Sequence, residues 1–323
     1  MTAVTMAKAL NQALYDALER DDRVLVFGED VGKLGGVFRV TDGLTDAFGR
    51  RVFNTPLAES AIAGIAVGLA IKGFRPVAEM QFDVFSYPAF EQITSHLAKY
   101  RTRTQGACPM QVVVRIPYGG NIGGIEQHSE SPETYYAHTA GLKVVSPATP
   151  GDAYALLTAA IQDPDPVIFL EPKSRYWSKE EVDLPAPALP LDRARIAREG
   201  TDATVIAYGP TVHVALAAAE AAAAEGTSLE VVDLRSLAPL DMDTLAASVR
   251  KTRRAVVAHE APVFMGLGAE IAARLMHDLF DVLAAPVERV GSATIPYPPA
   301  RFEKLFLPDA DRILEAVDRT REF

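Results

Sequence analysis

The feature that most constrains the fold is a run of apolar and small residues from Ala61 to Ile71, just after Glu59. Thr55 and Pro56 precede it and predict a helix with Thr55 as N-cap and Pro56 as its first residue. Because the run has no polar face, the sequence predicts a helix buried on every side. Glu59 at the start of that helix either complements the helix dipole or is a functional carboxylate whose proton affinity is shifted by burial.

Composition narrows the class of protein. The chain has 323 residues, enough for two compact domains, and its net charge of −10 argues against binding nucleic acid. The sequence shows no Lys/Arg cluster typical of a membrane surface site and no apolar stretch long enough to span a bilayer. Its first residues show no signal-peptide pattern. A single cysteine, Cys108, excludes an intrachain disulfide and a cysteine-based zinc site. We expect a cytoplasmic protein, or one of the mitochondrial matrix if the source is eukaryotic.

Apolar runs alternate with helical stretches through the first half of the chain, a pattern typical of a parallel α/β sheet. Helices are predicted at 7–14, 87–100 and 151–161. The predicted strands are 24–29, Arg75–Gln81, Gln111–Ile116, Lys143–Ser146 and Val167–Leu170.

A proline-rich segment then interrupts the alternation. Asp183–Pro190 holds three prolines in six residues, which excludes regular structure. Beyond it the sequence predicts strands at 203–208, 229–234, 255–259 and 287–290, and helices at 211–225, 266–280 and 309–321. The fold class is therefore α/β with two domains: a parallel-sheet domain over 1–182, a linker over 183–194 and a smaller domain over 195–323.

Common site motifs are missing from the sequence. It has no Walker phosphate loop, dinucleotide glycine fingerprint, nucleophile elbow or His-Glu-x-x-His. If the chain belongs to an enzyme, its chemistry must come from a cofactor or a partner chain.

Eight segments in order resemble one family, the beta subunits of the thiamine-diphosphate-dependent 2-oxo acid dehydrogenases. The resemblance covers nearly the whole chain, and Gln81–Phe90 is closer to the branched-chain type than to the mitochondrial pyruvate type. It implies a thiamine pyrimidine-binding domain followed by a transketolase C-terminal-like domain. The segments are Phe27–Val31, Gly35–Arg39, Asn54–Glu59, Gln81–Phe90, His96–Arg101, Gln127–Glu133, Gly141–Pro147 and His259–Pro262.

The resemblance assigns roles to five residues around a thiamine ring. Glu59 matches the carboxylate that bonds the aminopyrimidine ring nitrogen and favours the imino tautomer. Phe85 matches the aromatic residue packed on the pyrimidine, and Gln81 and Leu57 line the same pocket. Glu29 matches an acidic residue on an internal proton path between two active sites; the alternative is an ordinary carboxylate at a strand end.

His128 lies in a glycine-rich polar stretch and by itself would be a histidine of a surface loop. The resemblance instead places it at the mouth of the substrate channel, where it could donate a proton to the lipoyl sulfur during reductive acylation. His259 is interpreted as a core residue of the second domain.

The sequence also lacks the Gly-Asp-Gly motif that usually anchors the diphosphate through magnesium. The resemblance therefore implies that an alpha subunit holds magnesium and the diphosphate in an alpha2beta2 tetramer. Gly64 and Gly68 would let another helix approach closely at such an interface. In relatives a potassium ion is held mainly by backbone carbonyls, at positions matching Val112, Ala160, Ile161, Asp163 and Asp165.

Three functions compete. The first is a beta subunit that, with its alpha subunit, decarboxylates a branched-chain 2-oxo acid and acylates the lipoyl group of an acyltransferase core; a pyruvate or acetoin dehydrogenase is the variant of this hypothesis. The second is a single-chain thiamine enzyme such as a transketolase, which the short chain and the missing diphosphate motif disfavour. The third is a non-catalytic assembly module, which the joint presence of Glu59, Phe85 and His128 disfavours.

Overall fold

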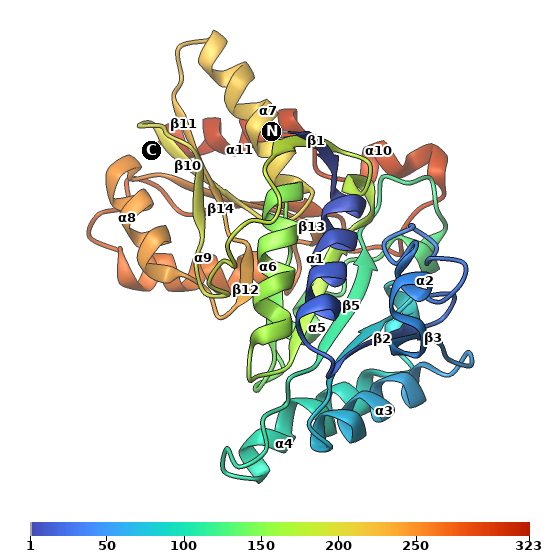
Figure 1. Cartoon of the computed structure of the whole chain (residues 1–323). Helices are drawn as coiled ribbons and strands as arrows, with labels where there is room; N and C mark the ends of the chain where they lie inside the picture. The colour runs from blue at the N-terminus through green and yellow to red at the C-terminus, as the bar shows by residue number, and fades with distance from the viewer. Residues whose placement is uncertain (1) are drawn as a thin grey trace. The chain divides into compact units, whose positions relative to one another are not determined.

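The computed structural model describes residues 2–323 and divides the chain into two compact units (Figure 1). The first comprises the chain up to Tyr118 together with Tyr135–Leu191, and the second comprises Gly119–Thr134 with Asp192–Phe323. The segment Gly119–Thr134 thus groups with the second unit although it interrupts the first in sequence. The domain boundaries proposed from the sequence stay a prediction.

The first unit is built on a parallel sheet in the order β6-β7-β5-β4-β2-β3. All strands run in the same direction, so their carboxyl ends meet at one edge of the sheet. A separate antiparallel pair joins β1 (Thr2–Thr5) to β8 (Lys179–Val182). The sheet strands are β2 (Val24–Gly28), β3 (Val52–Asn54), β4 (Arg75–Glu79), β5 (Val113–Tyr118), β6 (Lys143–Val145) and β7 (Val167–Pro172).

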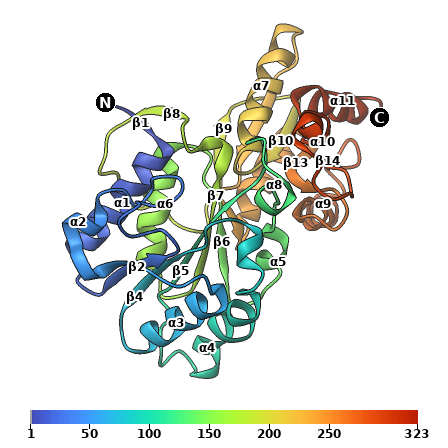
Figure 2. The same cartoon turned by 90° about the vertical axis from the view of Figure 1, so that its right-hand side faces the viewer.

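Two long helices, α1 (Met6–Arg20) and α6 (Pro150–Gln162), lie side by side against this sheet (Figures 1 and 2). Thr5 caps α1 through the Lys8 N–H, and Thr149 caps α6. Their inner faces form the main core with β7 and include Leu10, Leu14, Leu18, Tyr154, Leu157 and Phe169. The remaining helices are α2 (Leu44–Phe48), α3 (Glu59–Ile71), a π-helix (Gln92–Leu97) that continues into α4 (Ala98–Arg103), and α5 (Glu133–Ala137), where the chain re-enters this unit.

Helix α3 departs from its prediction in two ways. It begins at Glu59 with Ala58 as N-cap, so the expected start at Thr55 and Pro56 is wrong. The Thr55 Oγ1 is buried without a hydrogen-bond partner among the described residues, so it caps no helix, and the Thr55 N–H donates to the Gly28 carbonyl at 2.9 Å, which continues the pairing of β3 with β2.

The expected burial of α3 on every side is also wrong for this chain. Ile62, Ala63, Ala66 and Ala70 are buried, where the helix packs on β4 and the π-helix. Ile65 is 45% exposed, and Ile71 is exposed as well. The first unit covers only one face of a helix that is apolar all round.

The second unit contains a five-stranded sheet in the order β14-β13-β10-β11-β9, parallel except for β9. The four predicted strands are present, whereas β9 and helix α8 were not expected. The strands are β9 (Arg195–Arg198), β10 (Ala203–Ala207), β11 (Leu229–Asp233), β13 (Ala255–Pro262) and β14 (Glu288–Ser292), with a short β12 (Ser236–Ala238). The helices are α7 (Thr211–Ala224), α8 (Met242–Thr252), α9 (Leu267–Asp278), α10 (Glu303–Phe306) and α11 (Ala310–Arg321).

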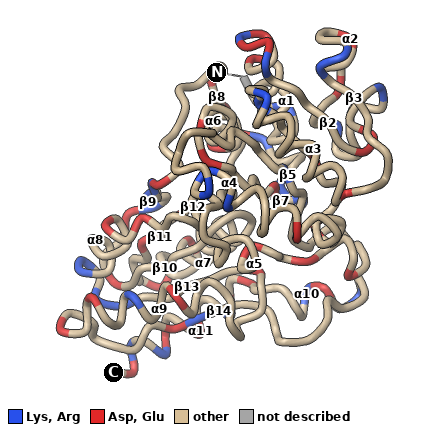
Figure 3. The backbone as a smooth tube through the Cα atoms, turned by 90° about the horizontal axis from the view of Figure 1, so that it is seen from below, with Lys and Arg blue, Asp and Glu red and all other residues tan. Residues whose placement is uncertain are grey.

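Residues 183–190 contain no helix or strand, as the prolines predict. Basic and acidic residues are interspersed along the elements of both units (Figure 3). Within residues 2–323, every helix is too short or too polar to cross a bilayer.

Candidate functional site

The candidate site lies at the carboxyl edge of the first unit's parallel sheet, where ligands of such sheets commonly bind. The register pairs Gly28 at the end of β2 with Glu79 at the end of β4. The residues that follow these strands, Glu29 and Gln81, therefore leave the sheet at the same edge.

The carboxylate of Glu29 is buried with no group in the described part of the chain to neutralise or hydrogen-bond it. Glu29 is only 3% exposed, and both of its carboxylate oxygens lack a hydrogen-bond partner among the described residues. Burial, reinforced by the negative charges of Glu59 and Asp30, raises the pKa of Glu29 to about 7. A carboxyl group with this pKa takes up and releases a proton near neutrality, which is the property expected of a proton-transfer residue.

Glu59 is the first residue of α3 and is half-buried. Its charge is felt by Glu29, so the two carboxylates, distant in sequence, lie within electrostatic reach of each other. The negative charge of Glu59 also sits at the positive end of the helix dipole. The dipole explanation and the functional one are therefore compatible at this position.

The loop after β4 carries the two other predicted ring contacts. The Gln81 Nε2 donates to the Asp30 carboxylate at 2.9 Å, which ties this loop to the segment of Glu29. The Phe85 ring, half-buried, packs edge-on against Phe82 with centroids 5.7 Å apart. Leu57 is 81% exposed and available to a ligand or partner.

A buried ion pair that the sequence did not reveal anchors the same loop. The Lys173 Nζ donates to Asp83 at 2.6 Å, and both side chains are fully buried. Lys173 follows β7 and also lies 5.5 Å from the centroid of the Phe82 ring. The loop bearing Gln81 and Phe85 is thus fixed to the end of a neighbouring strand.

A second buried network joins three strands below this edge. Arg115 on β5 bonds Glu79 on β4 at 2.6 Å and Glu171 on β7 at 2.6 and 2.8 Å, and the Tyr176 hydroxyl donates to Glu171 at 2.6 Å. Burial raises the pKa of Glu79. The sequence does not reveal that Arg115 pairs with Glu79 and Glu171, because the three residues lie on three different strands.

The structure assigns His128 to the second unit, at the end of a 3₁₀ turn (Glu126–His128), where it is half-buried. His259 is fully buried on β13, as predicted, and burial lowers its pKa to about 4.

The residues matched to a potassium site are already engaged in part. Lys143 bonds the Asp163 carboxylate at 2.7 Å, and Arg101 pairs with Asp165. The carbonyls of Val112 and Ala160 each accept one backbone N–H bond. Residues 2–323 contain no group of three or more His, Cys, Asp or Glu arranged for a metal.

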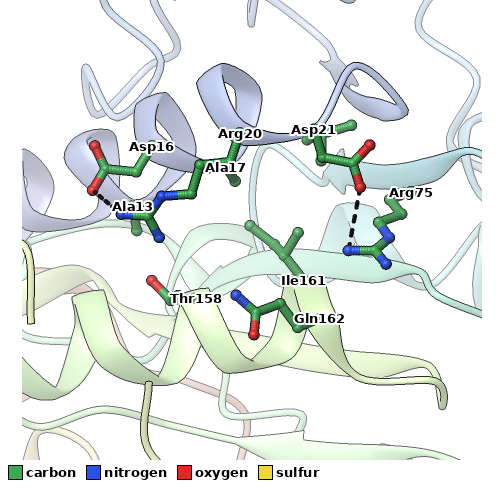
Figure 4. Close-up of a pocket in the computed structure, with 10 residues that line it drawn as sticks. Ala13, Asp16, Ala17, Arg20, Asp21, Arg75, Thr158, Ile161 and Gln162 are labelled. Atoms are coloured by element: carbon green, nitrogen blue, oxygen red, sulfur yellow. Dashed lines mark ion pairs between the residues drawn. The ribbon is translucent and has the colours of Figure 1, made fainter. Parts of the chain in front are cut away.

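A small cavity of about 60 Å³ lies between α1 and α6, and none of the site residues above lines it (Figure 4). Its charged side chains are paired: Arg20 with Asp16 at 3.6 Å and Arg75 with Asp21 at 3.3 Å. Neither Glu29 nor Glu59 lines it, so it is not the candidate site.

Comparison with known proteins gives this geometry a context. Residues 2–178 match the transketolase pyrimidine-binding domain, and residues 192–313 match the transketolase C-terminal domain. A 3-methyl-2-oxobutanoate dehydrogenase subunit beta of Mycobacterium tuberculosis is 59% identical over 319 residues, covering 98% of this chain and 92% of that protein. A pyruvate dehydrogenase E1 component subunit beta of Leifsonia xyli is 57% identical over 319 residues, covering 98% and 95%.

The chain belongs to the 2-oxo acid dehydrogenase beta-subunit family. The family and the two-domain α/β fold class predicted from the sequence are both confirmed. Among solved structures, a split-gene transketolase described as an inactive beta4 tetramer superposes with a TM-score of 0.81 at 27% identity, covering 98% of each chain. The roles predicted for individual site residues stay predictions.

Proposed function

We propose that this chain, together with an alpha subunit, catalyses the thiamine-diphosphate-dependent oxidative decarboxylation of a branched-chain 2-oxo acid. The observation that carries the proposal is the pair Glu29 and Glu59 at the carboxyl edge of the sheet, with the pKa of Glu29 raised to about 7. The branched-chain substrate is favoured over pyruvate by the Gln81–Phe90 segment. The two relatives named above are almost equally identical to this chain, but their names give different substrates. The substrate must therefore be tested directly.

The residues present suit thiamine diphosphate. Glu59 would hydrogen-bond the aminopyrimidine ring nitrogen and share with it the proton that favours the imino tautomer, with Phe85, Gln81 and Leu57 packed around that ring. When bound, the cofactor supplies the nucleophilic carbon and holds the electrons that decarboxylation releases. Glu29, which has no hydrogen-bond partner of its own among the described residues, would hold or return a proton near pH 7. A buried carboxyl that lacks a partner costs stability, which is common at functional sites.

An alpha subunit would complete the site with magnesium and the diphosphate-binding residues, in an alpha2beta2 tetramer. Two features of this chain support that partner: the missing Gly-Asp-Gly motif and the exposed face of α3. An apolar helix face left open in a single chain is typical of an interaction surface. On that face Gly68 has nothing within 4 Å of its would-be Cβ, whereas Gly64 already faces Gln92 of the π-helix.

His128 would serve the second half-reaction, transfer of the acyl group to the lipoyl group of an acyltransferase core. An imidazole titrates near neutrality, so it can donate a proton to the lipoyl sulfur as the thioester forms.

Three further assignments belong to this proposal. The pyrimidine-binding domain would span 1–182 and a docking and assembly domain 195–323. A potassium ion, if bound, would rest on backbone carbonyls, because Asp163 and Asp165 are already paired with cations. The complex would act in the cytoplasm.

The experiment is reconstitution of this chain with its alpha subunit, followed by decarboxylation assays with an artificial electron acceptor. We expect turnover with 3-methyl-2-oxobutanoate to exceed turnover with pyruvate. A preference for pyruvate would overturn the substrate, and no turnover with any 2-oxo acid would overturn the catalytic role in favour of an assembly module.

A further inference from the structure

The segment that bears His128 is a closed loop of the second unit. The Gly119 N–H donates to the Glu130 carbonyl at 2.9 Å and closes the base of the loop. Glu126 and Gln127 near the tip are exposed, and His128 follows them. A histidine near the tip of a loop has a defined position only if the backbone of that loop is fixed.

Two carboxylates bind the backbone of the first limb of this loop. The Gly120 N–H donates to Glu260 Oε1 at 2.8 Å, and the Asn121 N–H donates to Glu303 Oε1 at 2.8 Å. The Gly123 N–H donates to Glu303 Oε2 at 3.3 Å. Neighbouring N–H groups that converge on anions in this way form a nest, here occupied by the protein's own carboxylates.

The backbone conformation of the limb makes the nest possible. Gly119, Asn121 and Gly123 have φ angles of +81°, +61° and +68°, so alternate residues are left-handed. The glycines are also required for close approach. A Cβ at Gly120 would lie 1.9 Å from the Tyr297 hydroxyl, and one at Gly119 would lie 2.7 Å from Glu260 Oε2.

The two carboxylates are themselves rigidly placed. Glu260 is on β13, and Glu303 opens α10; each residue is only 7% exposed. The Tyr297 hydroxyl donates to Glu303 Oε1 at 2.6 Å. A buried carboxylate is tolerated when donors satisfy it, and for Glu303 these donors are this hydroxyl and the two loop N–H groups.

The far end of the loop is held in a similar way. Glu133 is fully buried and accepts a hydrogen bond of 2.6 Å from the Tyr208 hydroxyl on the β10 side of the unit. The stretch containing His128 therefore runs between two anchored ends.

We propose that Glu303 and Glu260 are positioning residues that fix the His128 loop through its backbone N–H groups. The expected effect on catalysis rests on the proposed role of His128. The anchoring of the loop by the two carboxylates does not depend on that role. Glu303 binds two loop N–H groups, those of Asn121 and Gly123, and its substitution therefore tests the proposal.

The test compares amide hydrogen exchange and activity in the assembled alpha–beta complex for Glu303→Gln and Tyr297→Phe. An amide side chain has one acceptor oxygen for three converging donors, so Glu303→Gln should speed exchange across residues 119–124 by at least about tenfold. Tyr297→Phe keeps the carboxylate but removes its hydroxyl donor and the longer 3.3 Å bond that this hydroxyl accepts from the Asn121 N–H, so a smaller increase in the same residues is expected. Transfer of the acyl group to a lipoyl domain should fall by about tenfold in Glu303→Gln, while decarboxylation with an artificial acceptor stays near normal.

The matched control is Glu230→Gln. Glu230 is another buried carboxylate of the second unit, with bonds to Ser248 at 2.5 Å and to the Gly200 N–H at 3.3 Å, and none to the loop. Its variant should leave exchange in the loop unchanged.

The outcomes separate this inference from the proposed function. Unchanged loop exchange in both Glu303→Gln and Tyr297→Phe would overturn the inference, as would an equal increase in Glu230→Gln. Suppose that Glu303→Gln speeds exchange in the loop but leaves acyl transfer normal, while His128→Ala still impairs acyl transfer. The claim that Glu303 positions His128 would then be overturned. If His128→Ala also leaves acyl transfer intact, the role proposed for His128 fails, whereas the anchoring of the loop by Glu303 stands.

Discussion

Replacing Glu29 with glutamine should make the protein more stable at neutral and higher pH. Burial and the nearby charges of Glu59 and Asp30 raise the pKa of Glu29 from 4.5 to about 7. Between these two values the folded state binds more protons than the unfolded state. The free energy of unfolding therefore falls as pH rises through this window, and the stability present below pH 4.5 is lost once pH exceeds 7.

The magnitude follows from the size of the shift. A shift of one pKa unit corresponds to about 1.36 kcal/mol, so ionising Glu29 in the folded state costs about 3 kcal/mol. Glutamine has nearly the same shape and cannot ionise. The advantage of Glu29→Gln over the native chain should thus grow by about 3 kcal/mol between pH 4.5 and pH 8.

The assay is urea unfolding of the full chain without its partner at a series of pH values. The control is Glu225→Gln, which makes the same substitution at an exposed carboxylate at the end of α7 and should change stability less between pH 5 and pH 8 than Glu29→Gln does. If the difference between Glu29→Gln and the native chain were the same at pH 5 and pH 8, the raised pKa of Glu29 would be refuted.

Three more predictions concern assembly and the two chemical steps. The chain alone should bind no thiamine diphosphate tightly in calorimetric titration with magnesium; micromolar affinity would contradict the need for an alpha subunit. Ile65→Asp, on the exposed face of α3, should leave the chain folded but prevent co-purification with that subunit, and an intact complex would show that this face is not the interface. His128→Ala should reduce lipoyl acylation on the order of a hundredfold and spare the artificial-acceptor assay, whereas equal losses in both would place His128 in substrate binding or decarboxylation.

The strands were largely predictable because their information is local. Apolar runs such as 24–29 and Val167–Leu170 predict buried strands directly, and the alanine-rich stretch 211–225 has strong helix propensity. The segments missed were those without such a pattern. Helix α8 is strongly polar on its outer face, and β9 is only four residues long.

The start and the burial of α3 could not be predicted because they depend on contacts with distant segments. Thr55 has the side chain of an N-cap, but its N–H pairs with the Gly28 carbonyl on β2 and its hydroxyl caps no helix. The apolar character of α3 is read correctly from the sequence. Ile65 stays exposed in this chain, so the sequence pattern overstates the burial of the helix.

In the candidate site, too, residues with a local sequence signal could be predicted and residues defined by long-range contacts could not. Glu59 could be singled out because it begins a recognisable apolar helix, and Glu29 because the resemblance assigns it a role. The ion pairs that fix the loop after β4 and the strands below it could not, because their contacts join distant segments. The bonds from Lys173 to Asp83 and from Arg115 to Glu171 span 90 and 56 residues of sequence.

Glu59→Gln in the reconstituted alpha–beta complex tests the central claim most directly. The measurement is 2-oxo-acid-dependent reduction of an artificial acceptor, alongside gel filtration to verify assembly. An amide keeps the shape of the side chain but cannot serve as the carboxylate at the pyrimidine ring, so we expect an intact complex whose turnover falls by on the order of a thousandfold, or about 4 kcal/mol in the barrier. Near-normal turnover by the assembled variant would contradict the account and leave Glu59 as a charge at a helix end.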